Sequence, residues 1–373
     1  MRVELRKNRS KPPRDKGWTR EFHEHGFAED APLSEERVRA KGALSRRRTI
    51  VTAGDQPMPA VDTAACRRGR VLRIHGLHCI VESDDGECHR CAVRRLLKSL
   101  STDERNIVAT GDVVWFRPSP VADRSDAEIE GLIERVEPRH GMLTRESRGR
   151  EHVLVANVDQ VVIVMSILEP ELKPHLIDRY LASAQLGGLD AVVCLNKCDL
   201  VPHELMQPIV GSYSQLGVPT LLTSAVTGTG IESLRERLRG RVTAFAGQSG
   251  VGKSTLLNAL EPGLALRVRD VSAVNQKGRH TTTTAEIHKL AMGGWVVDTP
   301  GVRQLQLASV QPEEVEALLP EFVPFVTHCS FKDCTHIHEV GCQVLRAVRR
   351  HWISERRYAS YVGMFTGLEP PAR

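Results

Sequence analysis

One short segment of this chain combines residue types that could hold a chain of phosphates. Residues 247–254 read GQSGVGKS and fit the pattern GxxxxGK[ST], in which glycines let backbone N–H groups approach phosphates. Lys253 would reach the β- and γ-phosphates, and Ser254 would bind Mg²⁺. The segment follows an apolar strand and opens a helix, which is the context such a loop needs. We therefore predict a nucleotide-binding loop made of Gly247, Gln248, Ser249, Gly250, Val251, Gly252, Lys253, Ser254 and Thr255.

A second motif, Asn196-Lys197-Cys198-Asp199, has the form NKxD and also follows an apolar strand. The Asp199 carboxylate could accept hydrogen bonds from N1–H and the exocyclic amine of guanine, a pair of donors that adenine lacks. Ser224 and Ala225, at the end of another strand, fit a loop that backs the base. NKxD precedes the phosphate loop here, the reverse of the usual order in GTP-binding chains. This order predicts a circularly permuted GTPase domain.

Asp298-Thr299-Pro300-Gly301 matches the DxxG signature of GTPases. Asp298 would hold Mg²⁺, directly or through water, and the Gly301 amide would sense the γ-phosphate; the alternative is a plain turn after a strand. Residues 278–284, GRHTTTT, lie where a switch with a Mg²⁺-binding threonine belongs. We select Thr282, and four consecutive threonines leave that choice open.

The catalytic group is less directly indicated. Val302 follows DxxG at the position where many GTPases place a glutamine that orients water, and an apolar side chain cannot do so. Hydrolysis would then need another group, a partner or a rearranged switch. Our candidate is His280, because an imidazole can position water or accept a proton near neutral pH. A surface histidine of the switch with no catalytic role is the alternative.

Four soft metal ligands lie close together near the C-terminus: Cys329, Cys334, His336 and Cys342. Three thiolates and one imidazole predict a closed, structural zinc site. His328 and His338 are rival ligands that we rank lower. A second CxxC, Cys88 to Cys91, lies on a predicted strand, where its two side chains would point to opposite faces. A second metal site there is the weaker reading.

The elements that would position these residues fall into four regions. We predict a basic arm over 1–62, disordered but for a short helix near 33–47, and an OB-type barrel over 63–148. A circularly permuted α/β GTPase domain follows over 149–302, and a small α-helical zinc-binding domain over 303–373. The barrel strands are expected at 70–74, 78–81, 87–93, 113–116 and 131–136.

Within the GTPase domain, apolar segments alternate with amphipathic ones in a doubly wound pattern. Strands are expected at 158–165, 191–195, 220–224, 242–246 and 295–297, and helices at 176–186, 231–238 and 253–260. Residues 344–365 read as one basic helix that either contacts RNA or packs on the GTPase domain. A basic face of the barrel could bind single strands or be ordinary solvated strand edges: Arg67, Arg68, Arg70, Arg73, Arg94, Arg95 and Lys98.

The overall composition is typical of a globular protein with a basic N-terminal arm. The 373 residues are 41% hydrophobic, enough for a real core, and carry a net charge of +5. Residues 1–50 hold 14 Lys/Arg against 8 Asp/Glu, or +6, so the remainder sums to −1 and the basic excess lies in the arm. The arm thus suits either a polyanionic partner or no function beyond solubility. No apolar stretch reaches membrane-spanning length, and the nine cysteines form no disulfide pattern, so we expect a cytoplasmic protein.

These motifs, in this order, resemble the bacterial ribosome small-subunit-dependent GTPase A family over about residues 65–365. The segments NKCDL, SAVTGTG, GQSGVGKST, GRHTTT and DTPGV and the Cys/His spacing carry the resemblance. It implies a GTPase of low intrinsic activity that binds GTP and GDP and is stimulated by the small ribosomal subunit. It also implies binding of 16S rRNA near the decoding centre during late 30S maturation.

The resemblance further implies one structural Zn²⁺, with Mg²⁺ accompanying GTP, and it matches His280 to the histidine proposed to act in hydrolysis. We expect a monomer without a membrane partner. Cys88 and the long arm depart from the family pattern. Two other readings remain: a GTP-controlled switch whose turnover is too slow to matter, and a permuted GTPase acting on the large subunit, against which the barrel argues.

Overall fold

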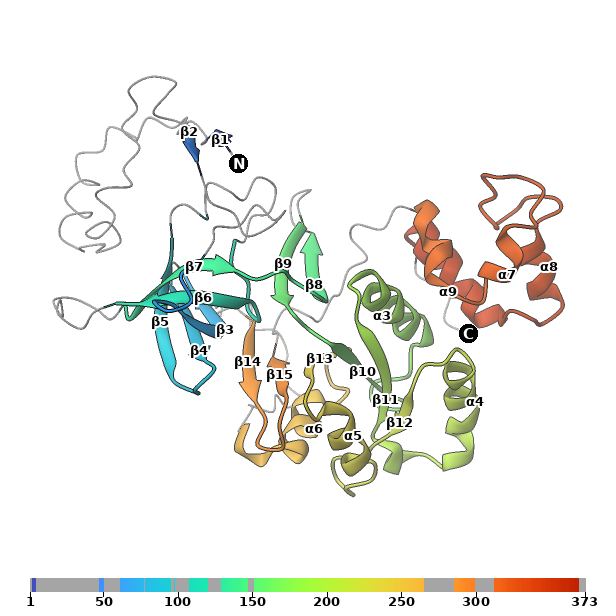
Figure 1. Ribbon diagram of the computed structural model, residues 1–373. Coiled ribbons are helices and arrows are strands. Elements are labelled where there is room, and N and C mark those ends of the chain that lie inside the picture. Colours follow the sequence, from blue (N-terminus) through green and yellow to red (C-terminus); the bar gives the residue numbers. More distant parts are fainter. Residues whose placement is uncertain are drawn as a thin grey trace, which may run out of the picture. The chain divides into compact units, whose positions relative to one another are not determined.

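The structure, a computed structural model, describes residues 2–4, 47–49, 61–76, 78–94, 97, 107–119, 129–146, 151–264, 285–298 and 312–368. The chain divides into two units, Met1–Pro138 and Arg139–Arg373 (Figure 1). Most of the predicted arm lies outside the described residues, as does the predicted helix near 33–47 apart from Arg47. Two short strands are described there, β1 (Arg2–Glu4) and β2 (Arg47–Thr49), which pair antiparallel.

The first unit contains a closed five-stranded barrel. Its strands are β3 (Arg67–His75), β4 (His78–Ser83), β5 (Cys88–Val93), β6 (Val113–Pro118) and β7 (Gly131–Val136). Strand β3 pairs antiparallel with both β4 and β6, and β7 lies between β6 and β5, parallel to β5. This order closes the sheet on itself, so the five predicted strands and the barrel are confirmed. Alternate residues point inward and form the core, among them Val71, Val81, Val114, Phe116 and Ile133.

The second unit is built on a six-stranded sheet with the order β12-β11-β10-β13-β15-β14. The strands are β10 (Gln160–Ser166), β11 (Asp190–Asn196), β12 (Thr220–Leu222), β13 (Val242–Ala246), β14 (Glu286–Lys289) and β15 (Trp295–Asp298). All neighbours are parallel except β14 and β15. Strands β10 and β13 are buried along their whole length, which explains their continuous apolar sequences. The parallel strands end at one edge, where ligands bind in such sheets.

Helices connect these strands: α3 (Pro174–Leu186), α4 (His203–Ser214), α5 (Ile231–Leu238) and α6 (Lys253–Leu260), with the short 3-10 helices η4 (Cys198–Leu200) and η5 (Pro262–Leu264). The predicted strands and helices are present, and α5, β13 and α6 have the predicted bounds. The sequence analysis did not foresee α4, β14 or the hairpin of β8 (Met142–Glu146) and β9 (Glu151–Ala156). No described helix is long and apolar enough to cross a membrane.

The C-terminal region consists of η7 (Pro312–Leu318), α7 (Val323–Val326), α8 (Gln343–Arg349) and α9 (Glu355–Thr366). The prediction of one helix over 344–365 is wrong. His351 adopts a left-handed backbone with φ 57°, and Ser354 is extended at the N-cap of α9, so the chain turns between α8 and α9. Tyr361 lies in the core of this region with its ring centroid 4.9 Å from that of Phe322, and half-buried Tyr358 packs against the same core.

A buried network of charged residues connects this region to helix α3 of the α/β sheet. The Asp178 carboxylate of α3 accepts hydrogen bonds from Arg357 Nη1 (2.7 Å), Ser360 Oγ (2.5 Å) and Tyr213 Oη (2.9 Å). Arg357 also forms a bidentate pair with Glu321, at 2.6 and 3.1 Å. Burial alone would lower the pKa of Arg357, but the two carboxylates outweigh burial and raise it. Separating the C-terminal region from α3 would leave buried charges without partners, which costs free energy.

Candidate functional site

The phosphate loop needs glycines because its backbone lies very close to β10 and to the base motif. Gly247, Gly250 and Gly252 all have positive φ, at 139°, 86° and 91°. A Cβ on Gly247 would lie 2.0 Å from the Val164 carbonyl oxygen, and one on Gly252 would lie 2.6 Å from Asn196 Nδ2. Other residues would therefore clash with β10 or with the base motif, so the loop is shaped for backbone contact with a ligand.

Lys253 opens α6 and curls over the loop. Its Nζ donates to the carbonyls of Gly247 (2.7 Å) and Gln248 (2.6 Å). Ser254 and Thr255 follow in the first helical turn, where free backbone N–H groups favour an anion. Lys253 thus holds the loop in shape, and its ammonium lies where phosphate oxygens would compete for it.

A buried hydrogen bond between Asn196 and Val251, here called the joint, connects the base motif to the phosphate loop. Asn196, at the end of β11, donates from Nδ2 to the Val251 carbonyl at 2.9 Å. Its Oδ1 accepts from Thr223 Oγ1 at 3.2 Å, which fixes the amide orientation. Val251 is 1% exposed and packs in the apolar core beneath the loop. Each loop therefore restrains the other.

The other residues of the base motif differ in exposure: Cys198 is buried, Lys197 is half-buried and Asp199 is exposed. Lys197 has a left-handed backbone, and its Nζ donates to the Glu169 carbonyl at 2.6 Å. The Cys198 backbone N–H donates to the Thr223 carbonyl at 3.1 Å, which ties η4 to the neighbouring loop. Asp199 is exposed on η4, where its carboxylate is accessible to a base.

The loop after β12 supplies the predicted backing for the base. Ser224 is fully buried, and its Oγ accepts from the Thr227 N–H at 3.2 Å. Ala225 packs at the margin of the same apolar core as Val251. The structure thus gathers the phosphate loop, the base motif and the Ser224–Ala225 loop at one edge of the sheet.

Other predicted site residues lie outside the described part of the chain, namely His280, Thr282 and Gly301. Asp298 is the last residue of β15, whose neighbour β13 leads into the phosphate loop. These assignments remain predictions. The sequence analysis missed Thr223 and Glu169, which orient Asn196 and Lys197. A hydroxyl at the end of a predicted strand was the available signal for Thr223.

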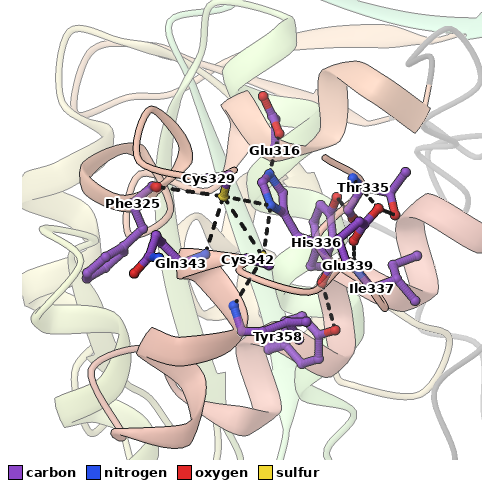
Figure 2. A network of polar contacts seen from close by, with 12 residues as sticks. Glu316, Phe325, Cys329, Thr335, His336, Ile337, Glu339, Cys342, Gln343 and Tyr358 are labelled. Carbon is purple, nitrogen blue, oxygen red and sulfur yellow. Dashed lines mark hydrogen bonds and ion pairs between the residues drawn. The ribbon is translucent and has the colours of Figure 1, made fainter. Parts of the chain in front are cut away.

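The four predicted metal ligands form a compact cluster, in which the ligand atoms all lie within 4.8 Å of one another. Figure 2 shows Cys329, His336 and Cys342 with the contacts between them. The Nδ1 atom of His336 lies 3.6 Å from Cys329 Sγ and 3.4 Å from Cys342 Sγ, and those two sulfurs are 3.9 Å apart. Ligand atoms of a tetrahedral zinc ion, with bonds of about 2.0–2.3 Å, are separated by about 3.5–3.8 Å. The donor set therefore fits zinc in type and spacing.

The surroundings of the cluster also suit a cation. Backbone N–H groups of Gln343 and Leu345 point at the sulfurs of Cys329 and Cys342, each at 3.4 Å. Burial, together with the neighbouring sulfurs, raises the pKa of the Cys334 thiol to about 12. A dication would reverse that shift and hold the thiolates deprotonated.

His336 is oriented by a carboxylate that the sequence analysis missed. Its Nε2 lies 2.6 Å from Glu316 Oε2 of η7, so Nε2–H can donate while Nδ1 faces the sulfurs. His336 also has a left-handed backbone, with φ 58°. Glu316 is twenty residues upstream, and no spacing rule indicated it. His328 and His338 are exposed and lie outside the cluster.

A second carboxylate, Glu339, fixes the loop between the ligands. It accepts hydrogen bonds from the backbone N–H groups of Thr335 (2.7 Å), Ile337 (3.1 Å) and His338 (3.2 Å), and from the Thr335 hydroxyl. Burial opposes ionisation of Glu339, but these donors prevail and lower its pKa to about 2. The loop that presents His336 is thus held by an ionised side chain at neutral pH.

The barrel gives less support to the other predicted sites. Cys88 is exposed and Cys91 is buried on β5, and neither joins a metal-ligand cluster among the described residues. Arg67 pairs with Asp85 and Glu87, and Arg68 pairs with Asp84, so part of the predicted basic face is compensated by acidic groups. Arg95 and Lys98 lie outside the described residues.

Comparison with known proteins agrees with this arrangement. A family model described as RsgA GTPase matches residues 136–308. A curated relative from Chlorobaculum tepidum, named small ribosomal subunit biogenesis GTPase RsgA, is 41% identical over 80% of this chain and 97% of its own length. A relative of the same name from Bacteroides fragilis is 36% identical over 81% and 97%.

Two solved structures are also similar. YjeQ from Thermotoga maritima has 37% identity and a TM-score of 0.66, and the match covers 81% of this chain and 98% of that one. YloQ, described as a circularly permuted GTPase, has 25% identity and a TM-score of 0.62 over 83% and 98%. The predicted fold class is therefore confirmed: a barrel, a permuted α/β GTPase region and a helical region with a Cys₃His cluster.

Proposed function

Since this chain belongs to the RsgA GTPase family, we propose that it binds GTP at the carboxyl edge of the β10–β15 sheet. It is a small ribosomal subunit biogenesis GTPase. The observation that carries the proposed site is the hydrogen bond from Asn196 to Val251, because it joins a base-reading loop to a phosphate-binding loop despite their reversed order. Asp199 would read the guanine, with Ser224 and Ala225 behind it.

In this site Lys253 would exchange its loop carbonyls for the β- and γ-phosphates, and the backbone N–H groups of residues 247–255 would surround them. Ser254, Thr282 and Asp298 would hold Mg²⁺, which when bound neutralises charge on the phosphates. The Gly301 amide would contact the γ-phosphate. These roles stabilise charge and position groups, which is most of what phosphoryl transfer requires.

We further propose that His280 orients the attacking water, since Val302 cannot. Cys329, Cys334, His336 and Cys342 would hold one Zn²⁺ with a structural role, because four protein ligands leave no open position for substrate. We expect the chain to act in the cytoplasm as a monomer that binds 16S rRNA late in 30S maturation.

GTP turnover by the purified chain, with and without small ribosomal subunits, tests this proposal. We expect low turnover alone and a marked rise with small subunits, but not with large subunits at the same concentration. Single-turnover kinetics with saturating small subunits separate a working GTPase from a slow switch, because a pure switch would keep GTP bound. Turnover unchanged by small subunits would rule the proposal out.

A further inference from the structure

One large aromatic side chain of the C-terminal region is left on the surface. Trp352 lies in the turn between α8 and α9 and is 62% exposed, although its backbone N–H is fixed to the Ala347 carbonyl at 2.9 Å. The preceding His351 has a left-handed backbone, with φ 57°, in the turn between α8 and α9. Such a backbone is unfavourable for a non-glycine residue. A firmly held backbone thus presents an exposed indole.

The indole is part of a short stack. The rings of Phe325 and Trp352 are nearly parallel, 20° apart, with centroids separated by 6.0 Å. The Arg350 guanidinium lies over the Trp352 ring, with Cζ 5.0 Å from its centroid. Half-buried Phe325 supports the stack from the domain core, so Trp352 and Arg350 are its outer members. Flat aromatic and guanidinium groups are the surfaces on which unpaired bases stack.

The charge around this stack is positive and uncompensated. Arg346 and Arg349 in α8 and Arg350 at its C-cap are exposed, and their spacing places them on one side of the helix end. Within the described part of the chain, no carboxylate forms an ion pair with any of the three. Arg356 and Arg357 differ, because they contact Ser212 and Asp178 of the GTPase fold. Two of these five arginines therefore contact the rest of the second unit, and the other three face solvent.

We propose that Trp352 and Arg350 form a stacking platform for an unpaired RNA base, with Arg346 and Arg349 holding the flanking phosphates. This inference rests on the proposed function and names the part of the RNA that the C-terminal region takes. Charge complementarity selects RNA: three guanidinium groups that form no ion pair among the described residues lie beside an aromatic face and match a base with its phosphates, whereas a protein partner would have to supply acidic groups.

Fluorescence polarisation of a labelled 12-nucleotide single-stranded RNA tests the platform, using the full zinc-loaded chain. We expect Trp352→Ala to raise the Kd about 5- to 150-fold, the range for losing one stacked base. Trp352→Phe keeps a flat ring and should restore most of the affinity. Leu205→Ala, an equally exposed apolar residue on α4, is the matched control and should stay within twofold of the parent. A duplex of the same sequence should bind without sensitivity to Trp352.

Trp352→Ala binding within twofold of the parent would overturn the platform, as would loss of affinity in Leu205→Ala of equal size. Unchanged RNA affinity combined with weaker co-sedimentation with small subunits would instead indicate a protein partner, and would also overturn it. Failure of the proposed function looks different: the parent chain would show no rise in GTP turnover with small subunits while Trp352→Ala still weakened RNA binding.

Discussion

Asn196 and Val251 are 55 positions apart in the sequence, yet the Asn196 side-chain amide donates to the Val251 carbonyl at 2.9 Å in the interior of the protein. The amide is oriented by Thr223 on its other side. Hydrogen bonds through Asn196 thus connect the base-reading loop to the phosphate-binding loop. A change at Asn196 should be felt in both.

Asn196→Asp is expected to weaken GTP and GDP alike, about tenfold or more. The new carboxylate would face the Val251 carbonyl without a donor between them, and an unsatisfied buried group costs about 1–3 kcal/mol. Equilibrium titration with fluorescent guanine nucleotides measures the effect. Asp199→Asn is the paired variant: it should reduce the preference for guanine over other bases instead. Unchanged base preference in Asp199→Asn would refute the assignment of Asp199.

Ser254→Ala should leave the fold intact and lower GTP turnover by about 100-fold or more. Its hydroxyl is a proposed Mg²⁺ ligand, and the metal contributes several kcal/mol to charge stabilisation in such reactions. Single-turnover assays over a range of Mg²⁺ concentrations report the change, and circular dichroism reports the fold. Thr255→Ala, at the next and exposed position, is the comparison; if Mg²⁺ dependence shifted equally in both, Ser254 would have no special role.

His280→Ala should reduce turnover in the presence of small subunits by about 10²- to 10⁴-fold, the usual contribution of a general acid or base. Nucleotide affinity should change little, because the proposed contact is with water. Measuring kcat separately from the Kd for GTP distinguishes this from a binding role. A matching loss of both would place His280 among the binding residues instead.

Glu316→Gln should weaken zinc binding about 10- to 100-fold without removing a ligand. The carboxylate next to His336 Nε2 orients the imidazole and makes it a better donor to the metal. Competition with a chromophoric chelator gives the affinity. Glu355→Gln, on an exposed turn of α9, supplies the same chemical change away from the cluster and should have no effect on zinc.

Arg357→Met should destabilise the second unit by about 3–5 kcal/mol, because Asp178 and Glu321 would remain buried without their cation. Thermal unfolding and hydrogen exchange at α3 and α9 both report this loss. Arg349→Met removes an exposed arginine of the same region and should change stability by less than about 0.5 kcal/mol. Equal effects of the two variants would show that the buried network contributes nothing.

The sequence predicted those parts of the fold and site that depend on local pattern. The bounds of β13 and α6 follow from an apolar segment, a glycine loop and a helical start in direct succession. The metal cluster followed from ligand type and spacing. Both signals lie within a few neighbouring residues, so these features depend little on contacts with distant parts of the chain.

Features that depend on distant partners were not predictable in this way. Within the α8–α9 segment only Ser354, a preferred N-cap residue, hints at a new helix start, and the left-handed backbone of His351 has no signal in its residue type. Glu316 and Arg357 acquire their roles only when η7 and α3 are brought beside the elements that carry their partners. Contacts between residues far apart in the sequence cannot be predicted from local residue patterns.

The place of β13 between β10 and β15 also bears on how the protein is made. A ribosome releases β10, β11 and their loops before the segment that completes the sheet between β10 and β15. During that interval the nascent chain has a base-reading loop but no Val251 carbonyl to accept from Asn196 Nδ2, and the inner edge of β10 is unpaired. Emergence of residues 242–251 would close that edge and create the joint together. Nucleotide binding would therefore begin late in translation and in a single step, which limits the time during which a half-formed site could capture GTP.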